Sequence, residues 1–182
     1  GSTFTYSRDQ FFGLTGFTTG LVDLWAISDH GVDNLGRDRR AIDPEESYRY
    51  RLLWQHRQHL PRDYQLTAEL GLISDRNFLE QYFESEWDEL KDQSTGVELK
   101  RSYDNVSWAL AADYRVNDFV TGTDWLPRFD HYWLGQPLLR DTFTWYEHTS
   151  LGFARLRTAD APVDPGTRGA FSYLPWETSA VT

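Results

Sequence analysis

Six charged side chains in alternating polar and apolar stretches are the residues whose type and spacing best suit a chemical role. They are Arg49, Arg51, Arg57, Glu69, Asp113 and Arg115. Residues two apart in an extended chain share one face, so these side chains are expected on polar strand faces. Guanidinium groups on such a face can bind the phosphate or carboxylate of an anionic lipid or sugar. The alternative is a polar face that acids such as Glu69 and Asp113 neutralise from neighbouring strands.

The sequence contains no recognisable metal-binding or serine-hydrolase motif, while its many carboxylates leave a glycosidase pair open. His56 and His59 are close together, but positions three apart on a strand point to opposite faces and would not share a metal. The chain has no HExxH, no GxSxG and no phosphate-binding P-loop. The tightest acidic run, from Glu84 to Asp92, is expected on the water face of a helix. We therefore predict no metal site.

The composition narrows the classes of function. The 182 residues carry 28 acidic against 18 basic side chains, and this net charge of −10 argues against nucleic-acid binding. Cysteine is absent, so disulfides and thiolate sites are excluded. Aromatic residues make up 16% of a chain whose mean hydropathy is −0.62. That pairing is typical of all-β carbohydrate-binding proteins and of outer-membrane β-barrels, which place rings at the lipid interfaces.

Alternation of apolar and polar residues predicts the strands that position these side chains. Residues 48–60 and 64–72 alternate on either side of Pro61 and a polar turn, which predicts an antiparallel hairpin. Residues 107–117 alternate as well, with Trp108 and Leu110 on the apolar face. Further strands are expected at residues 11–27 (two strands or one bent strand, because three glycines interrupt it), 96–103, 125–134 and 142–157.

One segment changes to a helical period. After Ser74 and Asp75, apolar residues recur at helical spacing from Phe78 to Leu90, and the acids between them, such as Glu80, are expected to face water. This predicts one short amphipathic helix in a connection. The expected fold is thus all-β, with about seven or eight antiparallel strands. Residues 1–157 would form the strand region, and residues 158–182 a Pro- and Gly-containing loop or tail with at most one further strand.

Several stretches of the sequence resemble one known family. The barrel region of the lipopolysaccharide-assembly outer-membrane protein family, also called organic solvent tolerance protein, is similar to this chain from about residue 11 to 157. The resemblance is strongest to planctomycete-like members. It is carried by residues 16–25, 33–40, 55–61 (QHRQHLP), 72–83 (LISDRNFLEQYF) and 125–130 (WLPRFD).

The resemblance implies transport without covalent chemistry, so we expect no catalytic residue, no cofactor and a protein that is not an enzyme. Family members form a large β-barrel in the Gram-negative cell outer membrane, where they receive lipopolysaccharide from periplasmic bridge components and insert it into the outer leaflet. A plug lipoprotein sits inside the barrel. By this resemblance the partners would be lipopolysaccharide or a related glycolipid, outer-membrane lipid, the plug and the bridge. The six charged residues named above would face the lumen. Because the family barrel is larger than this chain, the chain would be a partial barrel.

Two other classes remain open from the sequence. One is a soluble β-sandwich that binds carbohydrate through exposed rings, for which the candidates are Trp54, Trp108, Trp125, Trp133 and Trp145. The other is a small outer-membrane barrel that works alone. Dependence of folding on detergent separates the sandwich from both barrels.

Overall fold

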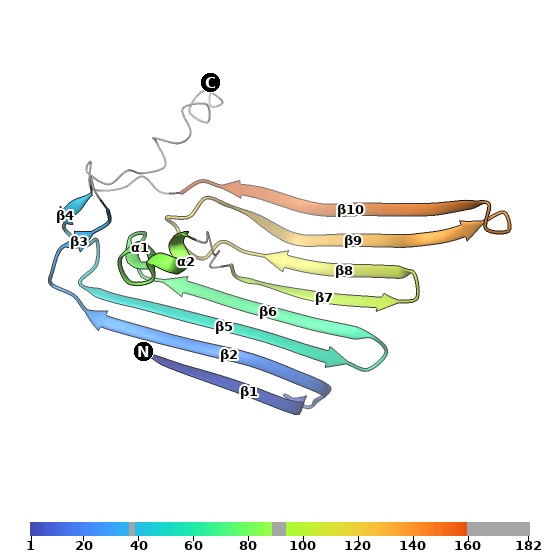
Figure 1. The fold of residues 1–182 in the computed structure, drawn as a ribbon, viewed down its shortest axis with the longest axis horizontal. Coiled ribbons are helices and arrows are strands. Elements are labelled where there is room, and N and C mark those ends of the chain that lie inside the picture. Colours follow the sequence, from blue (N-terminus) through green and yellow to red (C-terminus); the bar gives the residue numbers. More distant parts are fainter. Residues whose placement is uncertain (37–38, 89–93, 160–182) are drawn as a thin grey trace, which may run out of the picture.

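The computed structural model describes residues 1–36, 39–88 and 94–159, and its main feature is one antiparallel sheet of eight strands (Figure 1). Each strand pairs with the next strand of this sheet along the chain, which confirms the expected antiparallel all-β fold. The strands are β1 (Ser2–Phe11), β2 (Leu14–Ser28), β5 (Tyr48–Leu60), β6 (Tyr64–Ile73), β7 (Gly96–Tyr103), β8 (Val106–Asp113), β9 (Gly122–Leu138) and β10 (Phe143–Arg157).

Two hairpins at the start of the sheet have tight turns. The predicted hairpin of residues 48–60 and 64–72 is confirmed, with Leu60 paired to Tyr64 across the turn. The segment predicted at residues 11–27 contains the second turn, because Phe12 and Gly13 both have positive φ (46° and 79°). A two-residue turn in which both residues have positive φ matches the twist of the two strands that it joins. The segment is therefore the end of β1 followed by β2.

The strand predicted at residues 107–117 ends earlier, at Asp113. The reason lies in the uneven ends of neighbouring strands. The pairing of β7 with β6 reaches only Glu69, so the backbone of the last residues of β6 needs other partners. Asn117 provides them: its Oδ1 accepts from Ile73 N (3.2 Å) and its Nδ2 donates to Gly71 O (2.9 Å). The residues after Asp113 thus form a loop that closes the end of β6.

The single predicted helix is two short helices, α1 (Phe78–Tyr82) and α2 (Glu84–Asp88). Phe83 leaves the helical conformation between them (φ −137°, ψ 50°), and its ring lies 4.5 Å from the Arg51 guanidinium. Phe78 is fully buried and packs on Ile73 and Trp25 of the sheet. The helices lie near the ends of β5 and β6, beside the small β3 (Asp33–Asn34) and β4 (Arg40–Ile42) pair (Figure 1).

The sheet has two chemically different faces. Directly paired residues share a face, and one face, the apolar face, carries a row in register from β6 to β10: Leu66, Leu99, Leu110, Phe129 and Leu151. Leu110 is 44% exposed and Leu151 73% exposed, so the described residues leave much of this row uncovered. The opposite, polar face carries the charged side chains discussed below.

The two ends of the strands differ in their connections. Tight turns join β1 to β2, β5 to β6, β7 to β8 and β9 to β10 at one end, which we call the turn end (Figure 1). The long connections 29–47, 74–95 and 114–121 all lie at the other, the loop end. α1, α2, β3 and β4 belong to these long connections. Every long connection between strands of this sheet therefore lies at the same end of the strands.

The described sheet is open, with β1 and β10 as its outer strands. The tail predicted at residues 158–182 lies outside the described residues except for Thr158 and Ala159. No helix in the described ranges is long and apolar enough to cross a bilayer.

Candidate functional site

Five of the six predicted charged side chains lie on the polar face. Arg49, Arg51 and Arg57 alternate along β5, and the register places Glu69 beside Gln55 of the same face. Glu69 pairs with Gly96, and Gly96 pairs with Asp113, so Asp113 belongs to this face too. The face divides into two parts. One is a buried arginine cluster at the loop end, formed by Arg49, Arg51 and their partners, and the other is an open trough across the middle strands.

Arg49 is the centre of the buried cluster. Its side chain is fully buried and makes two parallel hydrogen bonds to Asp75, from Nε to Oδ2 (2.9 Å) and from Nη2 to Oδ1 (2.8 Å). Its Nη1 donates to Asp33 Oδ1 (2.6 Å). The guanidinium also lies 5.0 Å from the centre of the Tyr82 ring. Arg49 therefore has no surface left for a ligand.

The guanidinium of Arg51 is also buried beside carboxylates. Its Nη1 donates to Glu86 of α2 (3.0 Å), and its Nε lies 3.6 Å from Asp23 of β2. Glu80 of α1 forms a second ion pair of this kind with Arg39 (2.8 Å). The expectation that both acids face water is wrong, since each has a side chain at most 21% exposed. The part of the acidic run at residues 89–92 lies outside the described residues.

The carboxylates that neutralise Arg49 were not among the predicted partners. The sequence pointed to Glu69 and Asp113, but the structure uses Asp33 and Asp75, which lie in or beside the long connections. Strand periodicity contains no information about which loop acid folds back onto a strand. The only signal was the Ser74-Asp75 pair before the helical stretch.

A tyrosine and an aspartate complete the cluster at the loop end. The Tyr82 hydroxyl donates to Asp29, and the Gly31 amide donates to the same carboxylate (2.8 Å). These two hydrogen bonds, with the nearby Arg49, hold the pKa of Asp29 below its usual value. Burial, together with the bond to Asp29, raises the pKa of Tyr82 to about 12. An ionised Asp29 and a protonated Tyr82 are the forms that this hydrogen bond requires.

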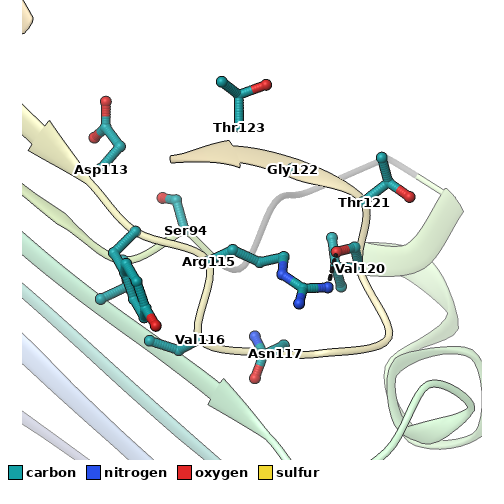
Figure 2. A pocket seen from close by; sticks show the side chains of 11 residues that line it. Ser94, Asp113, Arg115, Val116, Asn117, Val120, Thr121, Gly122 and Thr123 are labelled. Carbon is teal, nitrogen blue, oxygen red and sulfur yellow. Dashed lines mark hydrogen bonds between the residues drawn. The ribbon is translucent and has the colours of Figure 1, made fainter. Parts of the chain in front are cut away.

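The second part of the polar face is a hollow that we call the polar trough. A cavity of about 340 Å³ lies between β2, β5 and β6, and its lining includes Arg57 and Glu69. Glu69 also lines a neighbouring hollow of about 180 Å³, which reaches Asp113 on β8. A third hollow of about 220 Å³ shares Asp113 and continues into the loop after β8 (Figure 2). The three hollows adjoin one another across the sheet.

Arg115 differs from its prediction, because it follows β8 and lies in the loop. Figure 2 shows its side chain reaching across this loop toward Val120. Nη1 donates to the carbonyl oxygens of Asp118 (2.7 Å), Val120 (3.1 Å) and Thr158 (3.1 Å). Its backbone N–H donates to Asp124 (2.8 Å). Arg115 thus holds the loop together, and it is not part of a charged strand face.

The aromatic candidates are divided between the faces. Trp54, Trp108 and Trp133 are on the apolar face, whereas Trp125 is on the polar face, 5.7 Å from the Arg128 guanidinium. Trp145 of β10 is half exposed. The rings thus form no single platform for a sugar among the residues that the structure describes.

A hydrogen-bonded aromatic cluster on the apolar face was missed from the sequence. The hydroxyl of Tyr6 lies 2.7 Å from His56 Nδ1 and accepts a hydrogen bond from Trp54 Nε1 (3.1 Å). Tyr6 crosses the intervening strand at Gly20, where a Cβ would lie 2.0 Å from the ring. His59, three residues after His56, pairs on the opposite face, as expected. Tyr6, Gly20 and His56 lie on three neighbouring strands and are far apart in the sequence, so no local pattern indicates their contact.

Comparisons with protein-family models, curated proteins and solved structures find no match for this chain. Within the described ranges, no group of three or more His, Asp or Glu side chains is arranged to hold a metal ion. The site is thus defined by the polar trough, the buried arginine cluster and the exposed apolar face.

Proposed function

We propose that this chain is part of the wall of an outer-membrane β-barrel that assembles lipopolysaccharide into the outer leaflet. It acts as a transport protein and not as an enzyme. The observation that carries the proposal is an exposed apolar row on one face of the sheet from β6 to β10, opposite a face on which β5, β6 and β8 carry charged side chains. The cargo is proposed from the family resemblance of residues 11–157.

The apolar face supports a lipid environment. Leu110, Phe129 and Leu151 lie in one register row and are 36–73% exposed. Soluble monomers rarely leave contiguous apolar surface of this kind in water, and exposed patches usually mark an interface with protein or membrane. Barrel walls in the outer membrane turn such a face toward the acyl chains and the polar face toward the lumen.

The connections support the same orientation. Outer-membrane barrels have short turns on the periplasmic side and longer loops outside the cell, and the turn end and loop end have this asymmetry (Figure 1). The turns also lie progressively further out from β1–β2 to β9–β10 (Figure 1). Tilted strands in a barrel wall require such a stagger. We therefore propose that α1 and α2 lie toward the cell exterior.

The free edges indicate how the wall would be completed. Unpaired strand edges do not occur in lipid, because their backbone groups find no hydrogen-bond partners there. β1 and β10 are the outer strands of the sheet. In the proposal, further strands of a larger barrel pair with both edges.

The polar face suits a water-filled interior. Its buried arginines are paired with carboxylates, whereas Arg57 and Glu69 line a cavity of the trough that water can enter. Such a face can guide the hydrophilic part of a glycolipid while the apolar face contacts the membrane. The plug lipoprotein and the periplasmic bridge would be its protein partners, by the same resemblance.

Conditional depletion of the full-length protein in its own cells tests this function. The proposal predicts that newly made lipopolysaccharide stops reaching the cell surface and accumulates in the inner membrane, as measured by surface labelling and membrane fractionation. Re-expression should restore surface lipopolysaccharide. Normal surface delivery after depletion would contradict the proposal.

A further inference from the structure

We propose that the polar trough binds a neutral saccharide chain, and that Arg57 and Glu69 provide the main hydrogen bonds. This inference rests on the proposed function and deepens it, because it names the chemical class that the polar face contacts. Neither residue has a role in the buried arginine cluster, so the trough is a separate feature of the face.

Arg57 has its donors available. It lies in the middle of the sheet, between Thr19 of β2 and Thr67 of β6, and its side chain is exposed. Among the described residues no carboxylate lies within ion-pair distance of it, in contrast to Arg49 and Arg51. A guanidinium presents five N–H donors in a fixed plane. Arg57 can therefore donate to two adjacent oxygens of a ligand in the cavity of about 340 Å³ that it lines.

Glu69 places an acceptor in the same cavity. It is paired with Gln55, the polar-face residue two positions before Arg57 on β5. Ser94 donates to its Oε2 (2.9 Å), and no cation among the described residues neutralises it. A sugar hydroxyl both donates and accepts, so a ring with neighbouring hydroxyls matches a free arginine and a free carboxylate together. Thr19, Thr67 and Gln55 add uncharged hydrogen-bonding groups to the lining.

The balance of charge favours a neutral ligand. The two hollows that share Glu69 are lined by three carboxylates, Glu69, Glu98 and Asp113, and by one guanidinium, Arg57. A second guanidinium, Arg128, lies 3.8 Å from Asp113, so one carboxylate remains in excess. An excess of like charge in a hollow repels anions. A phosphate group or an acidic sugar would therefore bind less well here than an uncharged sugar. The hollows adjoin from β2 to β8, so a ligand of several rings can lie across the strands.

Titration calorimetry with maltoheptaose tests the inference. The full-length protein is purified in lauryldimethylamine oxide, a detergent without a sugar headgroup that could compete. We expect maltoheptaose to bind, and the anionic oligomer trigalacturonate to bind at least several-fold more weakly. Arg57→Ala and Glu69→Gln should each weaken maltoheptaose binding by about tenfold or more, the usual effect of losing a hydrogen bond to a charged group. Arg8→Ala is the matched control, because Arg8 is exposed on the opposite face of the sheet.

Three results would overturn the inference: no binding of maltoheptaose, equal affinity of the variants and the unaltered chain, or tighter binding of trigalacturonate. Arg57 makes no ion pair in the described structure, so its loss leaves the fold intact, which circular dichroism checks. The outcome is separable from the proposed function. A chain that folds only in detergent but binds no sugar refutes the inference alone. A chain that folds in water and binds sugar through Arg57 refutes the membrane proposal alone.

Discussion

Arg49 and Asp75 form a buried, two-pronged salt bridge between a strand and a long connection. Nε and Nη2 of Arg49 donate to the two carboxylate oxygens of Asp75, at 2.9 and 2.8 Å. The same carboxylate accepts from the backbone N–H of Asn77 (3.1 Å) at the start of α1. Because Asp33 binds the remaining nitrogen, Arg49 joins β5 to both the β2–β5 and the β6–β7 connections. The loop end of the polar face is organised around this one guanidinium.

Removing that guanidinium should destabilise the fold strongly. Arg49→Ala would leave Asp33 and Asp75, both at most 1% exposed, without their cation. Breaking a buried ion pair on one side costs roughly 3–5 kcal/mol, because the remaining charge is uncompensated. Denaturant unfolding in detergent measures the change. Arg57→Ala on the same strand is the control and should cost little. Equal stability of the two variants would contradict the burial of Arg49.

The assignment of the apolar face can be tested with adjacent residues of β10. Leu151 belongs to the apolar row, and Ser150 pairs with Asp130 on the polar face. Arginine on the lipid face costs roughly 2–4 kcal/mol at the bilayer midplane and little in a wet lumen. We therefore expect Leu151→Arg to reduce membrane assembly of the full-length protein, and Ser150→Arg to be tolerated. Heat-modifiability on gels reports assembly, and equal tolerance of both variants would count against the assignment.

The hydrogen bond between Tyr82 and Asp29 predicts a loss of stability at high pH. The pKa of Tyr82 is raised from 10.0 to about 12, so the folded state holds the phenol proton more tightly than the unfolded chain. The stabilisation is fully present below pH 10 and is lost as the pH rises toward 12. The free energy of unfolding should therefore fall more steeply over this window in the unaltered chain than in Tyr82→Phe. Parallel curves would contradict the assigned bond.

The cluster of Tyr6, His56 and Trp54 should stabilise the edge strand β1. Tyr6→Phe removes the hydroxyl that both neighbours use, and leaves the buried His56 (4% exposed) without this partner. The expected cost is about 1–3 kcal/mol of unfolding free energy. Gly20→Ala should act through the same contact, because its Cβ would overlap the Tyr6 ring. The double variant should then cost less than the sum of the two.

Tyr48→Phe is the matched control for this cluster. Tyr48 is 62% exposed on the same face, and we expect its loss to change the unfolding free energy by a few tenths of a kcal/mol at most. Additive effects of Tyr6→Phe and Gly20→Ala, or a Tyr6→Phe variant as stable as Tyr48→Phe, would show that the cluster carries no stability.

The sequence was most informative about strands and their faces. Two-residue alternation places Arg49, Arg51 and Arg57 on one face of β5, as the register confirms. Alternation is a local signal, because successive side chains of a strand point to opposite faces of the sheet. The turn at Pro61 was also predicted, from the proline and the polar Arg62 and Asp63 that follow it. In the structure both of these residues adopt positive φ.

The features that were missed depend on contacts between distant segments. The side chain of Asn117 takes the place of a strand partner for Ile73, which lies 44 positions earlier. Because the alternation continues through residue 117, the sequence predicted a longer strand there. The helix breaks at Phe83, where the ring packs under Arg51 of a neighbouring strand. In both places a tertiary contact overrides a local preference. The partners of Arg49 lie in loops, where sequence pattern does not determine position.

The most direct test of the central claim is sedimentation of the purified full-length protein with and without mild detergent, with far-ultraviolet circular dichroism of each sample. The account predicts a monodisperse species with β structure only in detergent, because Leu110 and Leu151 of the apolar face need a lipid-like environment. A chain that is folded, monomeric and soluble without detergent would contradict the outer-membrane assignment.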